Sequence, residues 1–266
     1  MPEESQQLLS IAVAACREAG GLLLENFGQL TAAAVDEKAK NDFVTALDRA
    51  SEKAVIDLIR SRCPEHDILA EESGAALRNS DYRWIIDPLD GTTNFIKQIP
   101  FFAISIAVFH RGQALAAAVF NPALGELFTA LRHGGAFLNG KAIQVSSQND
   151  FSRAFLATGF PHHAKFHLPP FVRAFSDIFY HAAGVRRLGS AALDLCYTAC
   201  GRFEGFWELG LKPWDIAGGS LILEEAGGRV SDFRGADGYL DSGFVAAGNP
   251  ATHLRLIEIL SHHFEV

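Results

Sequence analysis

The sequence predicts a layered α/β protein whose sheets are mixed or antiparallel. The chain has 266 residues, of which 48% are hydrophobic, so it can bury a large core. Short apolar stretches typical of strands occur in consecutive runs, and they also alternate with amphipathic stretches typical of helices. A Rossmann or TIM arrangement would show the alternation alone. We therefore expect layers of helix and sheet built partly from strands that follow one another directly.

The first half of the chain begins with a helix. Apolar residues at helical spacing predict this helix over residues 5–27, and "AKNDFVT" at 39–45 reads as a polar loop. A second helix is expected over 46–61, ending before Pro64. "DILAEES" at 67–73 and "WIIDP" at 84–88 are typical of short strands that end in acid.

Antiparallel strands are predicted to follow. "FFAISIAVF" and "ALAAAVFN" flank "HRGQ", which indicates a hairpin. The segment "GELFTALRHGGAFLNG" continues the same pattern, with glycine and asparagine at its turns.

The pattern changes after about residue 150. Strands are expected at 153–160, 185–189, 203–210 and 243–249, and helices at 171–184, 190–201, 214–228 and 250–263. Ser190 suits the N-cap of its helix and Gly201 suits the end. Gly227 and Gly228 close the next helix. Residue 150 is thus the natural boundary between an N-terminal half, 1–150, and a C-terminal half, 151–266.

Charge and composition narrow the functional classes. The formal net charge is −8, whereas a nucleic-acid surface needs clustered Lys and Arg, so we expect no direct nucleic-acid binding. The acidic start is no secretory signal, and the longest apolar run, at 101–109, is too short to span a bilayer. The four cysteines form no C-x-x-C pair, which disfavours a zinc site. We expect a cytoplasmic protein with reduced thiols and no membrane partner.

Several carboxylates lie at the ends of apolar strands or at the starts of helices. A carboxylate in such a place is costly to desolvate unless it is paired or binds a metal. Oxygen-only ligand sets favour hard cations, so Mg²⁺ or Mn²⁺ is expected. For any one of these residues alone, an ordinary helix cap or strand end explains the carboxylate equally well. They are Asp42, Asp48, Glu71, Glu72, Asp87, Asp90 and Asp215.

The segment "DPLDGTT" is the hardest of these to explain as ordinary structure. Pro88 turns the backbone and Gly91 permits a close approach, so both aspartates, the Leu89 carbonyl and the Thr92 hydroxyl can converge on one point. The haloacid dehalogenase phosphatases use D-x-D-G-T, one residue shorter. In a regular strand the longer spacing puts the second aspartate on the opposite face. We therefore do not interpret Asp87 as a covalent nucleophile.

Three segments together resemble the motifs of the inositol monophosphatase family of Mg²⁺-dependent, lithium-sensitive phosphatases. They are "AEES", "WIIDPLDGTTNF" and "WDIAGGSLILEEAGG". "NDFVTALD" resembles the early loop of the family, and "RRLGSAALDL" resembles its substrate segment. The resemblance spans nearly the whole chain and is strongest to the bacterial branch. One departure is Lys97, where many members have a histidine.

The resemblance assigns roles to matching positions. The implied metal ligands are Glu71, Asp87, the Leu89 carbonyl, Asp90 and Asp215. The implied catalytic residues, which include the pair Thr92 and Asp48 that orients and activates the attacking water, are Thr92, Asp48 and Glu71. The implied substrate-binding residues are Asp90, Gly91, Thr92, Arg186, Gly189, Ser190, Ala191, Glu208 and Asp215. Lys38 and Asp42 match a mobile loop linked to an additional, weaker metal.

The resemblance also implies a fold and a reaction. The family fold is a five-layer αβαβα sandwich, usually a homodimer. In this chain it would form one compact catalytic unit, with the main metal motifs in 1–150 and the substrate segment and last metal ligand in 151–266. The implied reaction is hydrolysis of myo-inositol 1-phosphate by a water activated by two or three Mg²⁺ ions, with Li⁺ inhibiting.

Two alternatives stay open at this stage. The substrate is also expected among related esters: fructose 1,6-bisphosphate, histidinol phosphate, nucleotide phosphates or 3′-phosphoadenosine phosphate. A different class of function is a regulatory interaction protein with secondary phosphatase activity, whose protein partners the sequence does not name.

Overall fold

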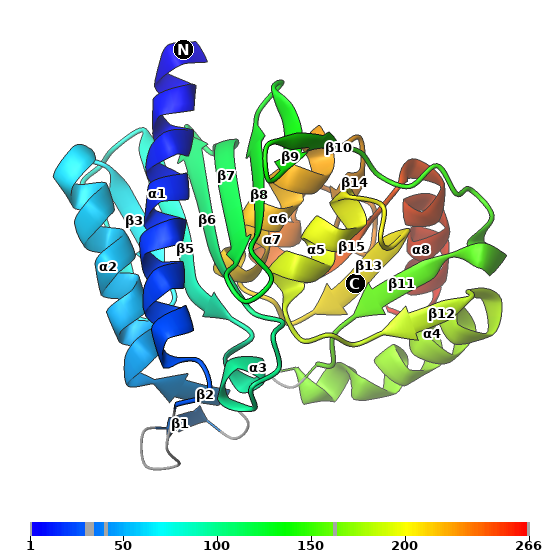
Figure 1. Cartoon of the computed structure of the whole chain (residues 1–266). Coiled ribbons are helices and arrows are strands. Elements are labelled where there is room, and N and C mark those ends of the chain that lie inside the picture. Colours follow the sequence, from blue (N-terminus) through cyan, green and yellow to red (C-terminus); the bar gives the residue numbers. More distant parts are fainter. Residues whose placement is uncertain (1, 30–34, 40–41, 162–163, 265–266) are drawn as a thin grey trace.

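The computed structural model describes residues 2–29, 35–39, 42–161 and 164–264. Helices and sheets alternate in five layers (Figure 1). Two helices cover one sheet, two central helices separate it from a second sheet, and two further helices cover the far side. This layered α/β arrangement confirms the predicted fold class.

The first layer consists of α1, Pro2–Asn26, and α2, Ala46–Arg62. Helix α1 packs on β6 and β7, and α2 packs on β5. The eight-stranded sheet below has the order β10-β9-β8-β7-β6-β5-β3-β4, with β3 and β5 as its parallel pair. The strands are β3 Asp67–Ala70, β4 Gly74–Ala76, β5 Tyr82–Asp90, β6 Ala103–His110, β7 Gln113–Asn121, β8 Glu126–Leu131, β9 Gly135–Leu138 and β10 Lys141–Ile143.

The second sheet has five strands in the order β12-β11-β13-β15-β14. Helices α5, Ala191–Ala199, and α6, Pro213–Glu225, form the central layer: α6 packs on the first sheet and α5 on the second. Helices α4, Leu168–His181, and α8, Pro250–His263, form the outer layer. The strands are β11 Phe155–Thr158, β12 Gly184–Arg186, β13 Gly205–Leu209, β14 Arg229–Ser231 and β15 Phe244–Gly248.

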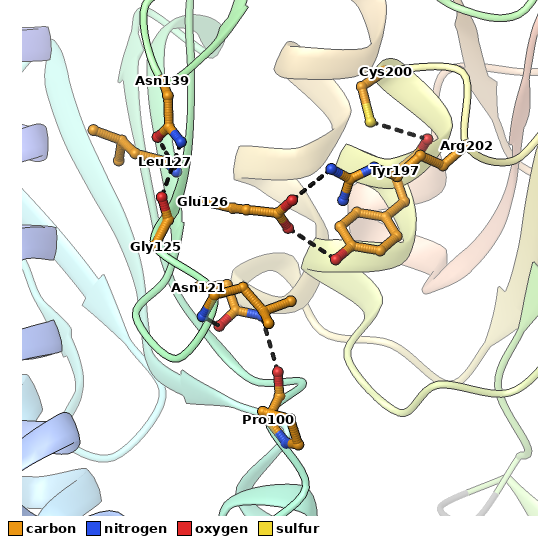
Figure 2. Close-up of polar contacts among 10 residues, drawn as sticks. Pro100, Asn121, Gly125, Glu126, Leu127, Asn139, Tyr197, Cys200 and Arg202 are labelled. Carbon is orange, nitrogen blue, oxygen red and sulfur yellow. Dashed lines mark hydrogen bonds and ion pairs between the residues drawn. The ribbon is translucent and has the colours of Figure 1, made fainter.

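A polar cluster ties the first sheet to the central layer (Figure 2). The Tyr197 hydroxyl of α5 donates to the Glu126 carboxylate of β8 over 2.8 Å, and Arg202 pairs with the other carboxylate oxygen. The Arg202 guanidinium also lies 4.2 Å from the centroid of the Tyr197 ring. Beside it, Asn139 donates to the Gly125 carbonyl and accepts from the Leu127 amide, which holds the turn before β8.

The structure corrects some local predictions. The stretch expected as a polar loop at 39–45 contributes to an antiparallel hairpin of β1, Val35–Ala39, and β2, Asp42–Thr45. Several short elements were not predicted, because three or four residues are too few to show a periodicity: among them are β4, β10, β14 and α7, Tyr239–Ser242. Ser190 and Gly201 lie where predicted, Ser190 as N-cap and Gly201 in the left-handed region just past the end of α5.

Helix α1 meets a length and composition test for a membrane span over Glu3–Asn26, among the residues that the structure describes. Half of its most apolar 18-residue stretch is buried inside the protein, and α1 covers the first sheet. The core helices of soluble proteins pass the same test, so we interpret α1 as a core helix.

Candidate active site

Strand β5 carries "DPLD" into the centre of the molecule. Trp84, Ile85 and Ile86 are buried, so the strand forms a rigid apolar base for the residues that follow. Asp87 pairs with Ser105 of β6 and Asp90 with Ala103, so three steps along β5 match two steps along β6. This register shift is a β-bulge.

The bulge changes the geometry expected from the sequence. In a regular strand, residues three apart lie on opposite faces, but an extra bulged residue brings them to the same side. The negative charge of Asp90 raises the pKa of Asp87, which is consistent with the two carboxylates lying on the same side. The argument from regular alternation therefore does not apply to this segment.

A hydroxyl and a carboxylate meet just after the bulge. Thr92 begins α3, Thr92–Ile96, and its Oγ1 lies 3.1 Å from Asp48 Oδ1 and 3.0 Å from the Leu89 carbonyl. Asp48 is buried in the first turn of α2. One turn on, the Ser51 hydroxyl donates to the Pro88 carbonyl over 2.8 Å. Helix α2 thus holds both the turn and the carboxylate beside Thr92.

Glu71 follows the end of β3, the strand parallel to β5. Its amide donates to the Ile86 carbonyl over 3.2 Å, so the two strand ends lie together. The next two amides, of Glu72 and Ser73, donate to the carboxylate of Glu52 in α2. Sequence reasoning missed Glu52, although it lies one helical turn from Asp48 and so on the same face.

Asp90 joins the two halves of the chain. Its Oδ2 accepts from the Ser190 hydroxyl at 2.6 Å and from the Ala192 amide at 2.8 Å, across about a hundred residues of sequence. Ser190 caps α5 and Ala192 is in its first turn, where free amides and the helix dipole favour an anion.

Glycines make this approach close. Gly91 has φ +92°, and a Cβ there would lie 3.2 Å from the Gly189 carbonyl. Gly189 has φ +93°, and its Cβ would meet Arg187 and Asn94. Asn94, which the sequence reasoning did not select, donates to the Leu188 and Phe101 carbonyls. Only glycine fits both positions, so the two halves meet at "DGTTN" and "LGS".

Asp215 and Glu208 reach the same region from the second half. Asp215 is in the first turn of α6, where its Oδ2 accepts from the Lys212 amide at 2.7 Å, so it lies three residues inside the helix and is not its N-cap. Glu208 is on β13. A Cβ on Gly159 would lie 1.8 Å from the Glu208 carboxylate, so this glycine leaves room for it.

Burial raises the pKa of three of these carboxylates, Asp87, Asp90 and Asp215. Burial raises the pKa of Asp87 well above its usual range, helped by the charges of Glu71, Asp90 and Asp215. Burial and the Asp90 charge do the same to the pKa of Asp215. The pKa of Asp90 rises to about 6 through burial, against the Ser190 and Ala192 hydrogen bonds. The carboxylates therefore share one low-dielectric site with an excess of negative charge.

Glu208 and Asp194 extend this acidic site. Burial raises the pKa of Glu208 to about 8, with Arg187 opposing the shift and Asp90 adding to it. Burial, Glu208 and Asp90 raise the pKa of Asp194, whose Oδ1 has no hydrogen-bond partner among the described residues. The sequence signal for Asp194 was a carboxylate in the otherwise apolar "SAALDL", which was not recognised as a site residue.

The donor set fits a hard divalent cation. All the side-chain donors are carboxylate oxygens whose repulsion a cation would relieve, and Mg²⁺ and Mn²⁺ prefer such ligands. Within the part of the chain that is described, no three His, Cys, Asp or Glu side chains already stand in metal-binding geometry. Glu71, Asp87, Asp90 and Asp215 would therefore have to draw closer around an ion.

Two adjacent arginines differ in position. The Arg186 guanidinium lies 5.2 Å from the Phe155 ring centroid, on the edge strand β12. The charge of Arg187 instead reaches Asp90, Asp194 and Glu208. Lys38 and Asp42 lie in β1 and β2, and their side chains are outside the described residues.

Comparisons with known proteins show which family the chain resembles. The sequence profile of the inositol monophosphatase family matches residues 4–265. "Nus factor SuhB" of Escherichia coli is 48% identical over 91% of this chain and 91% of its own length.

Solved structures share the fold. The extragenic suppressor protein suhB from Bartonella henselae superposes with a TM-score of 0.92 at 37% identity, over 96% of this chain and 98% of that one. The inositol monophosphatase from Anabaena gives a TM-score of 0.86 at 37% identity, over 97% and 96%. On these matches and the carboxylate site described above, the chain belongs to the inositol monophosphatase family, and this membership supports a Mg²⁺-dependent phosphatase.

Proposed function

We propose that this protein is an inositol-1-monophosphatase that releases phosphate from myo-inositol 1-phosphate and similar polyol monophosphates. The observation that carries the proposal is the site of Glu71, Asp87, Asp90 and Asp215, in which the charges of Glu71 and Asp90 raise the pKa values of Asp87 and Asp215. Such a site suits two or three Mg²⁺ ions, or Mn²⁺, with a phosphate between them.

Bound Mg²⁺ would offset the charge of the phosphate and lower the pKa of the attacking water. Thr92 and Asp48 are placed to position that water: the hydroxyl and the carboxylate lie within 3.1 Å, and a carboxylate can take up the proton that the water loses. The Thr92 hydroxyl also lies 3.0 Å from the Leu89 carbonyl oxygen, so it can donate its hydrogen bond either to Asp48 or to this carbonyl. No aspartyl-phosphate intermediate is needed in this scheme.

The second half of the chain would recognise the alcohol part of the ester. The Glu208 carboxylate can accept hydrogen bonds from ring hydroxyls, and Gly189, Ser190 and Ala191 border the site through the Asp90 contact. For the arginine, the charge interactions favour Arg187 over the matched Arg186. Comparing kcat/KM across myo-inositol 1-phosphate, fructose 1,6-bisphosphate, histidinol phosphate and 3′-phosphoadenosine phosphate would rank the substrates.

The reaction is tested by phosphate release from myo-inositol 1-phosphate with and without Mg²⁺. Activity should vanish in excess chelator, return with Mg²⁺ and fall with Li⁺. Asp90→Asn should abolish it, whereas Asp81→Asn, an exposed carboxylate that pairs with Arg111, should not. Full activity in chelator would overturn the proposal.

A second role in protein interaction is favoured by the name of one group of relatives, Nus factor SuhB, which describes no enzyme. Capture experiments with the wild type and Asp90→Asn separate the two roles: partners retained by the inactive variant support a role independent of catalysis. A homodimer and a weaker metal site at the Lys38 and Asp42 loop stay predictions from the family resemblance. A cytoplasmic location stays a prediction from the sequence.

A further inference from the structure

Glu52 holds the turn that carries Glu71. Its Oε2 accepts from the Glu72 amide at 2.8 Å and its Oε1 accepts from the Ser73 amide at 2.9 Å. The Glu52 side chain is only 4% exposed. Hydrogen bonds from backbone amides to a buried carboxylate are charge-assisted and short, so this pair is strong.

Helix α2 contacts the site at several points along one face. On α2, Asp48 lies beside Thr92, Ser51 holds the Pro88 carbonyl, and Glu52 holds the amides after Glu71. The Glu71 amide is itself fixed to the Ile86 carbonyl of β5. One helix face therefore sets the position of the Glu71 backbone relative to "DPLD".

We propose that Glu52 is a positioning residue for metal binding: by clamping the amides of Glu72 and Ser73, it keeps the Glu71 carboxylate where it can share a cation with Asp87. The inference rests on the proposed function in that it takes Glu71 to be a metal ligand. Groups that orient metal ligands typically change affinity by roughly 10- to 100-fold when they are replaced.

The test is Glu52→Gln, which keeps the shape of the side chain. The amide has only one acceptor oxygen, and its NH₂ group would face the second N–H donor. The outer side of Glu52 borders a hollow of about 340 Å³ lined also by Arg49 and Lys53, so the variant causes no overpacking. The matched control is Asp57→Asn, a carboxylate-to-amide change on the same helix at a side chain that is 63% exposed.

Two readouts are needed, both without substrate. The Mg²⁺ dissociation constant, measured by titration calorimetry at low and high salt, should rise by roughly 10- to 100-fold in Glu52→Gln and stay unchanged in Asp57→Asn. Amide hydrogen exchange at Glu72 and Ser73 should accelerate in Glu52→Gln alone. The rise in the Mg²⁺ dissociation constant should persist at high salt. If it came only from the lost negative charge of Glu52 acting at long range, salt would screen that effect and the rise would shrink.

The outcomes separate this inference from the proposed function. Unchanged Mg²⁺ affinity in a folded Glu52→Gln, or unchanged exchange at the two amides, overturns the positioning role. A wild type that binds no Mg²⁺ also overturns it. If Mg²⁺ binds the wild type and binds Glu52→Gln more weakly as predicted, but the wild type releases no phosphate, the inference stands and the proposed function is removed. If Glu52→Gln does not fold, Glu52→Asp, which shortens the side chain by one carbon, provides the same two comparisons.

Discussion

In the proposed reaction, Thr92 and Asp48 act as a pair. The hydroxyl and the carboxylate lie 3.1 Å apart at the ends of two different helices, and neither alone both orients and deprotonates a water. The fold thus joins two side chains that are 44 positions apart in the sequence by one hydrogen bond.

We expect Thr92→Val and Asp48→Asn each to lower kcat by roughly 10²- to 10⁴-fold, since general-base assistance is worth about that much. The double variant should be little worse than the poorer single variant, because either change disables the pair. Steady-state kinetics at saturating Mg²⁺ check this, with the exposed neighbour Thr93→Val as the control. Losses that multiply in the double variant would contradict a joint role.

The acidic site also predicts a pH dependence of stability. The pKa of Asp90 is raised to about 6 and that of Glu208 to about 8, above their values in an unfolded chain. The unfolded chain therefore releases these protons at lower pH than the folded protein does. Between about pH 4 and pH 8 it binds fewer protons, so the free energy of unfolding of the metal-free protein should fall as pH rises.

Thermal unfolding in chelator at several pH values measures this slope. Glu208→Gln should flatten it between pH 5 and pH 8, and Glu258→Gln, which removes an exposed carboxylate, should not. Added Mg²⁺ should raise the melting temperature more at pH 8 than at pH 6, because protons and the metal compete for the same oxygens. A slope that is equal in the wild type and Glu208→Gln would contradict this account of Glu208.

At the scale of single elements, the packing of α1 on the first sheet depends on Gly20 but not on its neighbour Gly21. A Cβ on Gly20 would lie 2.6 Å from the Phe120 ring of β7 and 3.3 Å from Pro122. A Cβ on Gly21, the next residue, would meet nothing within 4 Å. Close contact between helix and sheet therefore requires a glycine at position 20, whereas a larger residue would fit at position 21.

Gly20→Ala should lower the free energy of unfolding by about 1–3 kcal/mol, the usual cost of overpacking. Gly21→Ala should raise it by about 0.5–1 kcal/mol, because alanine favours a helix. Chemical denaturation of both variants checks the contrast. Equal effects of the two substitutions would show that α1 does not approach β7 as closely as described.

The element boundaries show what local sequence can predict. Ser190 and Gly201 delimit α5 as expected, because caps act within a few residues. The bulge in β5 was not predicted, since it depends on how β6 pairs with "DPLD". The hairpin of β1 and β2 was missed for the same reason: its two strands are short, and each is stabilised by its partner.

At the scale of the molecule, the Glu126 cluster connects the first sheet to the central helices (Figure 2). Glu126 comes from β8, whereas Tyr197 and Arg202 come from α5 and the turn after it. The opposite end of α5 holds Asp90 through Ser190 and Ala192. The cluster and the site thus anchor the two ends of one central helix to the same sheet.

Tyr197→Phe should lower the free energy of unfolding by about 1.5 kcal/mol, as expected for a hydrogen bond to a charged group. In a double-mutant cycle with Glu126→Gln, the two losses should not add, because the residues share one interaction. Tyr180→Phe, at a side chain that is 82% exposed, is the control and should change stability by less than about 0.5 kcal/mol. Additive losses would mean that the Tyr197–Glu126 contact contributes little.

The sequence by itself determined the motifs, most helices and strands, the layered class and, through the family motifs, most carboxylates of the acidic site, because periodicity, caps and short motifs are local properties of the chain. It did not identify Glu52, Asn94, Arg187 or Asp194, whose importance depends on partners far away in the sequence. Only the tertiary structure decided which carboxylates share one space. The bulge brings Asp87 and Asp90 to one side, and packing of the central helices brings Asp90 to Ser190. These contacts cross the layers, and no local pattern encodes them.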